Sequence, residues 1–162
     1  MPKKPIQPSY AQHFLDLLDS AYQSRAWHGP ALKSTLKGLT VIEALFRPKP
    51  HTHNIWEIAL HCAYWKYRVM RQLTNVPCPR FPLRGTNWFS RTDGNASQWN
   101  SEMQILDQQH KHLQAVVLAL PSARLGLPEI THLVNGIALH DAYHAGQVKL
   151  IRRYQASTKH PP

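Results

Sequence analysis

Apolar residues recur at steps of three and four along most of the chain, which is the spacing of a helix with one buried face. Long stretches with this pattern occur at about 9–26, 54–73, 97–120 and 128–154. A shorter pattern over 31–46 predicts one or two helical turns after the first helix. No stretch alternates convincingly between apolar and polar residues as a half-buried strand does. The sequence therefore predicts an all-α chain with four long helices.

The helix ends carry their own signals. Residues 9–12 and 54–57 have the form of capping boxes, in which two side chains each bond an unpaired backbone N–H group. Pro121 ends the third helix, and Pro128 suits the first turn of the fourth. From Ser157 onward we expect a frayed tail.

Four amphipathic helices in one chain of this length favour a single bundle domain over residues 1–162, with its core at about 9–155. A long loop at about 74–96 separates the second and third helices. It contains Phe81, Trp88 and Phe89, and long loops inside compact domains are often functional. These aromatic side chains either pin the loop over the bundle, which we favour slightly, or form a substrate lid.

Polar residues interrupt the core-facing stripe of the fourth helix, which consists of Leu133, Ile137, His140, His144, Gln147 and Ile151. His140 and His144 are four residues apart, so they project from the same helix face one turn apart. Buried polar groups cost on the order of 1–3 kcal/mol each unless they are partnered. A metal ion and a hydrogen-bonded core network are equally good partners on this evidence alone.

A third histidine, His61, lies in the middle of the second helix. By itself it fits a structural core histidine better than a ligand, but together with His140 and His144 it favours a metal. Three protein ligands leave a coordination position open, as in catalytic sites, where a divalent metal acidifies water or activates a thiol. We expect His110 to be either a core residue or a residue that supports the metal ligands, and not a ligand itself.

Three neighbours are candidates for orienting the metal ligands. Gln147 lies one helical turn beyond His144 and is the best of them. Asp141 and Tyr143 project roughly 100° to either side of the ligand face.

Composition and charge narrow the function classes. The formal charge is +10, but the 19 Lys and Arg residues are dispersed, which favours a solvated basic surface over a nucleic-acid site. Only two cysteines, which form no disulfide framework, together with the lack of a signal-peptide pattern and of a membrane span, lead us to expect a cytoplasmic protein. Phosphate-binding glycine loops, zinc-type cysteine pairs and nucleophile elbows are absent from the sequence.

Two segments resemble the DinB-like superfamily of metal-dependent enzymes: residues 54–65, which include His61, and the motif at 140–147. Residues 27–30 and 99–113 are also similar to that group, so the resemblance covers about 10–155. It implies an up-down-down-up four-helix bundle, frequent homodimers, and a nickel or zinc ion on His61, His140 and His144.

The resemblance also implies a small-molecule substrate and, in characterised relatives, a low-molecular-weight thiol cosubstrate such as glutathione, mycothiol or bacillithiol. Our own inference is that the basic residues at 77–91 would suit an anionic thiol. A thiol transferase or hydrolase-like enzyme is therefore the leading hypothesis. A non-catalytic, stress-linked metal-binding protein is the alternative, and a basic nucleic-acid-binding bundle is less favoured.

Overall fold

The computed structural model describes residues 9–23, 27, 29–74 and 77–159. Within these ranges the chain contains helices and no strand, so the all-α prediction is confirmed. None of these helices is both long and apolar enough to cross a bilayer. The helices are α1 (Tyr10–Tyr22), α2 (Leu32–Leu36), α3 (Val41–Leu45), α4 (Ile55–Leu73), α5 (Ala96–Ala119), α6 (Ser122–Leu125) and α7 (Pro128–Lys159).

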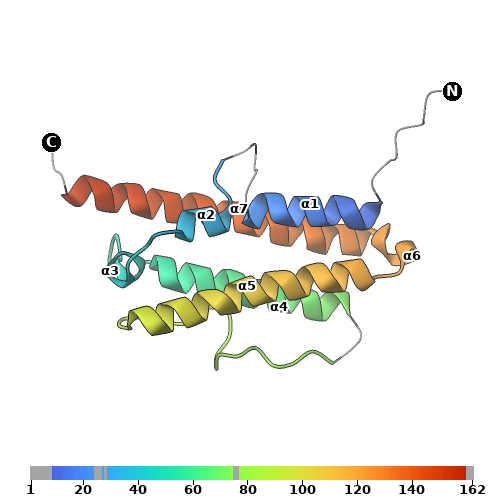
Figure 1. The fold of residues 1–162 in the computed structure, drawn as a ribbon, viewed down its shortest axis with the longest axis horizontal. Coiled ribbons are helices and arrows are strands. Elements are labelled where there is room, and N and C mark those ends of the chain that lie inside the picture. The colour runs from blue at the N-terminus through green and yellow to red at the C-terminus, as the bar shows by residue number, and fades with distance from the viewer. Residues whose placement is uncertain (1–8, 24–26, 28, 75–76, 160–162) are drawn as a thin grey trace.

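The long helices α1, α4, α5 and α7 lie along a common direction in Figure 1. Helices α4 and α5 share the most extensive contact, α1 packs on α7, and α4 also packs on α7. In that view α1 and α7 run from right to left, whereas α4 and α5 run from left to right. Because α4 and α5 are parallel, the segment between them must return along the length of α4, roughly 28 Å at 1.5 Å per residue. This requirement explains the length of the loop.

Helix α4 is the centre of the core, as its largely apolar circumference predicts. Its residues are buried on most sides, and Ile55, Trp56 and Leu60 are fully buried. The indole of Trp56 donates a hydrogen bond to Glu102 of α5 at 2.6 Å, which satisfies the polar edge of a buried ring. Helix α4 packs on both α5 and α7, which places it at the centre of the core.

The two predicted capping boxes have different outcomes. Both halves form at the start of α4, where Asn54 and Glu57 each cap the other's backbone N–H. At α1 only the Ser9 half forms, because the Gln12 side chain donates instead to Asp16, one turn further on, at 2.8 Å. The prediction for Gln12 is therefore wrong.

Helix boundaries also differ from the prediction at several points. Helix α1 ends at Tyr22, short of 26, although residues 24–26 lie outside the described ranges. The short helix α6 was not expected, and it places Leu125 in the core. Helix α7 continues to Lys159, so the predicted helix end at about Tyr154 and the frayed start at Ser157 are wrong. Gln155 explains this extension, because it is buried and donates to the Glu43 carbonyl at 2.7 Å. The last three residues of the predicted tail, 160–162, lie outside the described ranges.

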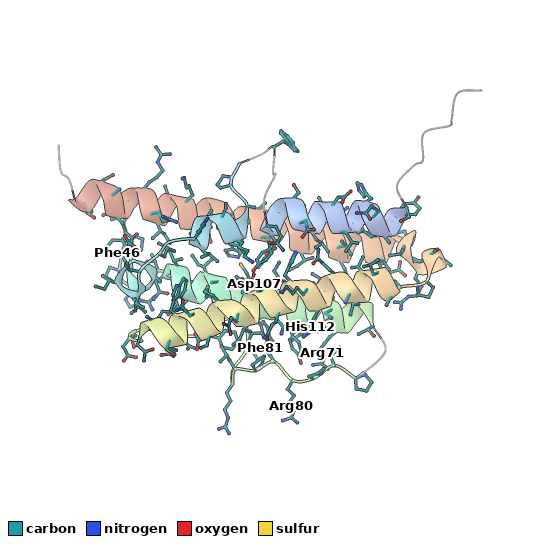
Figure 2. The ribbon with its side chains drawn as sticks, viewed as in Figure 1. Phe46, Arg71, Arg80, Phe81, Asp107 and His112 are labelled. Carbon is teal, nitrogen blue, oxygen red and sulfur yellow. The ribbon has the colours of Figure 1, made fainter. Side chains whose placement is uncertain are left out.

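Aromatic contacts hold the α4–α5 loop against α4. Phe81 and Phe89 lie 5.3 Å apart between ring centroids, and both rings contact Tyr64. Figure 2 shows Phe81 between the loop and the helices. Pinning by aromatic residues is thus part of the loop's role.

A buried ion pair joins α4 to α7. Lys66 and Asp141 are each fully buried, and the Lys66 ammonium donates to one carboxylate oxygen of Asp141. Burial raises the pKa of Asp141 above its ordinary value, and the ammonium of Lys66 opposes that shift. Each charge thus depends on the other for compensation.

Replacing Lys66 alone should therefore destabilise the protein strongly. We expect Lys66→Met to cost about 3–5 kcal/mol, because it leaves a buried carboxylate without its cation. The double variant Lys66→Met/Asp141→Leu should lose less than the sum of the two single variants. Denaturant unfolding of the three variants measures this coupling, and strictly additive losses would contradict it.

Glu57 connects the α4–α5 loop to the start of α4. Its carboxylate accepts two hydrogen bonds from the guanidinium of Arg47 and one from the backbone N–H of Arg91 at 2.9 Å. It also lies 3.1 Å from His53 Nδ1. Burial raises the pKa of this carboxyl group, but these hydrogen bonds outweigh burial and hold the pKa below its ordinary value.

The variant Glu57→Gln should lose about 2 kcal/mol at neutral pH, because hydrogen bonds to a charged acceptor are replaced by weaker ones. Since folding lowers this pKa, the contribution of Glu57 is complete above the ordinary value of 4.5 and is lost as pH falls through the folded-state pKa. The stability gap to wild type should therefore shrink in acid. Unfolding at several pH values tests this, with exposed Glu129→Gln as control; a gap that widens in acid would contradict it.

Candidate metal centre

The structure brings His61 of α4 together with His140 and His144 of α7. The Nε2 atom of His140 lies 3.1 Å from Nε2 of His61 and 3.2 Å from Nε2 of His144. The three side chains each offer one ring nitrogen within 4.8 Å of the others. Three imidazoles from two helices thus point their Nε2 atoms at one another.

Hydrogen bonds to the opposite ring nitrogens orient two of these imidazoles. His61 Nδ1 donates to the backbone carbonyl of Asn87 at 3.0 Å. His144 Nδ1 lies 2.7 Å from the side-chain oxygen of Gln147. Gln147 is itself held, because its amide nitrogen donates to the hydroxyl of Tyr143 at 2.9 Å. Such contacts fix the tautomer of a metal-binding histidine.

This arrangement distinguishes between the two partners that the sequence leaves open. A carbonyl oxygen only accepts, so the Nδ1 atoms of His61 and His144 carry the protons and their Nε2 atoms present lone pairs. His140 Nε2 lies between those lone pairs, and a single N–H there can donate fully to only one of them. A divalent cation can accept all three lone pairs, so the donor set fits a metal better than a hydrogen-bonded network.

The imidazoles are neutral at pH 7, as metal ligands must be. Burial lowers the pKa of His61 to about 4. Burial, with smaller effects of the neighbouring imidazoles, lowers the pKa of His140 to about 3. The pKa of His144 is also lowered, chiefly by burial.

Trp88 of the α4–α5 loop covers one face of His61. Its ring stacks on His61 at 3.8 Å between centroids and 8° between planes, and on His53 at 3.5 Å and 4°. Three parallel rings therefore form one wall of the site. Trp65 stands edge-on to His61, and its indole N–H donates to the side chain of Asn87 at 2.9 Å.

The three histidines line a pocket of about 760 Å³. This volume is in the range of small-molecule sites. Its lining comes from the α3–α4 connection, α4, the loop and α7: Pro48, Thr52, His53, Ile58, His61, Trp65, Asn87, Trp88, His140, Tyr143, His144, Gln147, Leu150 and Ile151. The structure thus places the three-histidine cluster where a small molecule has access.

The other residues singled out in the sequence have separate positions. Gln147 and Tyr143 contact His144 in series, as described above. Asp141 is paired with Lys66, and no hydrogen bond links it to a ligand histidine among the contacts of the described residues. His110 is buried beside α1, where its Nε2 lies 3.1 Å from Asp19, so it is not part of the cluster.

A second possible ligand group shares His140. Within the described ranges, Cys62, His140 and Asp141 also have potential ligand atoms within 4.8 Å of one another. Cys62 is fully buried, and burial raises the pKa of its thiol well above the ordinary value. Because Asp141 is already paired with Lys66, this group is poorly suited to a divalent cation.

Sequence reasoning missed several residues of the site. Asn87 gave no signal, although its backbone orients His61; it adopts φ 64°, a left-handed conformation that asparagine tolerates well. His53 was also missed. Trp88 was noticed as an aromatic residue of the loop, but its contact with His61 depends on the path of the loop. Trp65 lies one turn after His61 on α4, so its contact with His61 follows from helical spacing.

The basic residues of the loop do not line this pocket. Arg80 extends away from the helices in Figure 2. Arg91 is paired with Glu102 at 2.6 Å, and Arg84 is absent from the lining. Their positions therefore give no support to the idea that they hold an anionic thiol here.

Comparison with known proteins agrees with the resemblance seen in the sequence. The chain has no significant match among curated proteins or solved structures. The sequence model of the DinB superfamily matches residues 26–148, which include all three histidines of the cluster. This match covers most of the chain, and we conclude that the protein belongs to the DinB superfamily.

Proposed function

We propose that this protein is a metal-dependent enzyme in which His61, His140 and His144 hold a divalent metal, nickel or zinc. The observation that carries this proposal is the convergence of three Nε2 atoms on one pocket. Membership of the DinB superfamily supports it. Bound there, the metal would supply Lewis-acid chemistry that activates a thiol or a water molecule.

The chain's own residues have definable roles in this proposal. Asn87 and Gln147 hold the protons of His61 and His144 on Nδ1, which keeps both Nε2 lone pairs directed at the metal position. Trp65 and Trp88 restrict water beside His61. The Tyr143 hydroxyl accepts from Gln147, so its own proton remains available to donate to a group in the pocket.

Two reaction types remain within the proposal, a thiol transferase with a low-molecular-weight thiol as cosubstrate and a hydrolase-like enzyme. A second function is a metal-binding protein without turnover. One observation favours it: the pocket lining contains no aspartate or glutamate, in the part of the chain that the structure describes, so no carboxylate is placed to act as a general base.

We further assign the packing of α1, α4, α5 and α7 to an up-down-down-up four-helix bundle forming a single domain. The run of the helices in Figure 1 supports this assignment. A homodimer and a cytoplasmic location remain predictions. Light scattering of the purified protein tests the first of these.

Metal analysis tests the central proposal. We expect about one divalent metal per chain in the purified protein, lost in His140→Ala because two imidazoles bind such an ion much more weakly than three. Metal at about 100 times its dissociation constant should stabilise the wild type by about 2.7 kcal/mol. His132→Ala is the matched control, because His132 lies on the same helix outside the cluster.

The proposal is wrong if wild type holds no stoichiometric metal and His140→Ala alters neither metal content nor melting temperature. Loss of metal in His132→Ala would also contradict the assignment of the ligands.

Turnover assays separate the reaction types. A thiol transferase should consume an electrophile only when glutathione, mycothiol or bacillithiol is added, and the rate should fall at least about tenfold when metal is removed. A hydrolase should act without any thiol. If the metal-loaded protein turns over no electrophile or ester in such a screen, the non-catalytic alternative is favoured.

A further inference from the structure

We infer that the pocket above the three histidines binds an uncharged aromatic or apolar group of its substrate and disfavours an anionic one. Calling this group part of a substrate rests on the proposed function. The preference for an uncharged group is argued from the chemistry of the pocket wall. The inference concerns the part of the ligand that contacts the pocket wall, and not the atom that would bind the metal.

The wall is mainly apolar and comes from separate segments of the chain. Its apolar members are Pro48, Ile58, Trp65, Trp88, Leu150 and Ile151. Trp65 and Leu150 are partly exposed, at 37% and 68%, so their apolar surface is available to a ligand. Burial of apolar ligand surface against such side chains is the main source of affinity in small-molecule sites.

No Lys, Arg, Asp or Glu side chain lines this pocket within residues 9–23, 27, 29–74 and 77–159. Apart from the histidines, its polar groups are the neutral side chains of Thr52, Asn87, Tyr143 and Gln147. Asn87 and Gln147 already bond neighbouring side chains of the site. In the metal-free protein, a carboxylate placed here would lose its hydration without gaining a cationic side chain as its partner.

Two arginine side chains near the pocket already form hydrogen bonds elsewhere. Arg47 lines an adjoining cavity with His53 and Trp88, but its guanidinium bonds both carboxylate oxygens of Glu57. Arg152 of α7 donates to the backbone carbonyls of Thr35 and Lys37. The high positive charge of the chain therefore does not extend into the pocket.

A pair of matched probes tests this inference by ligand-observed NMR: 4-methylbenzyl alcohol, which is neutral, and 4-(hydroxymethyl)benzoate, in which a carboxylate replaces the methyl group. Both are measured with metal-free and zinc-loaded protein at neutral pH. We expect the neutral probe to bind at least about tenfold more tightly to the metal-free protein. In the zinc-loaded protein a carboxylate can ligate the ion at its open position, so the metal-free form is the one that tests the pocket wall.

Two exposed leucines on α7 provide a test and its control. Leu150 lines the pocket and is 68% exposed, whereas Leu139 is 69% exposed and does not line it. Leu150→Arg adds a cation at the pocket, so it should reduce or reverse the preference for the neutral probe. Leu139→Arg adds the same charge elsewhere on the helix and should leave the preference unchanged. Light scattering of both variants shows whether either substitution changes the oligomeric state, so that such a change is not mistaken for an effect on the pocket.

Equal or tighter binding of the carboxylate probe by metal-free wild type would overturn the inference, as would no binding of either probe. A shift of preference as large in Leu139→Arg as in Leu150→Arg would also overturn it, because the effect would then be one of total charge. The metal content of each sample separates this test from the proposed function. If the protein prefers the neutral probe but takes up no metal, the preference supports the pocket chemistry. The missing metal then contradicts only the enzyme proposal.

Discussion

The buried ion pair between Lys66 and Asp141 is the constraint on which the relation of α4 to α7 depends. If either side chain moved out of the core or along its helix, its partner would remain as an uncompensated buried charge. That costs far more free energy than a shifted apolar contact. Lys66 is five residues beyond His61 on α4, and Asp141 adjoins His140 on α7. The pair thus sets the register of the two helices that carry the three histidines.

The third structural part of the site is the α4–α5 loop, whose length follows from the parallel course of α4 and α5. Its position is fixed at two places, by the aromatic contacts of Phe81 and Phe89 and by the hydrogen bond of Arg91 to Glu57. Between them, Asn87 and Trp88 reach His61. The contacts that pin the loop against α4 therefore also position the site. The sequence had left pinning and a substrate lid as alternative roles for the loop's aromatic residues.

The sequence predicted those features that depend on local periodicity or local capping. These include the long helices, the capping box at Asn54 and the shared face of His140 and His144. Features set by distant contacts were not predictable. The end of α7 depends on Gln155 reaching the Glu43 carbonyl, and the role of Asn87 depends on a loop path set by contacts with α4. The basic residues at 77–91 were a poor guide to the ligand, because composition does not show that Arg91 is paired with Glu102.

Taken together, these features lead us to propose a metal held by three neutral imidazoles beside an uncharged pocket. X-ray absorption at the zinc edge of the zinc-loaded protein tests it most directly, since it reports the donor atoms themselves. We predict three imidazole nitrogen neighbours at about 2.0–2.1 Å, with no sulfur. A sulfur neighbour at about 2.3 Å, which would implicate Cys62, or a spectrum without imidazole scattering would contradict the account.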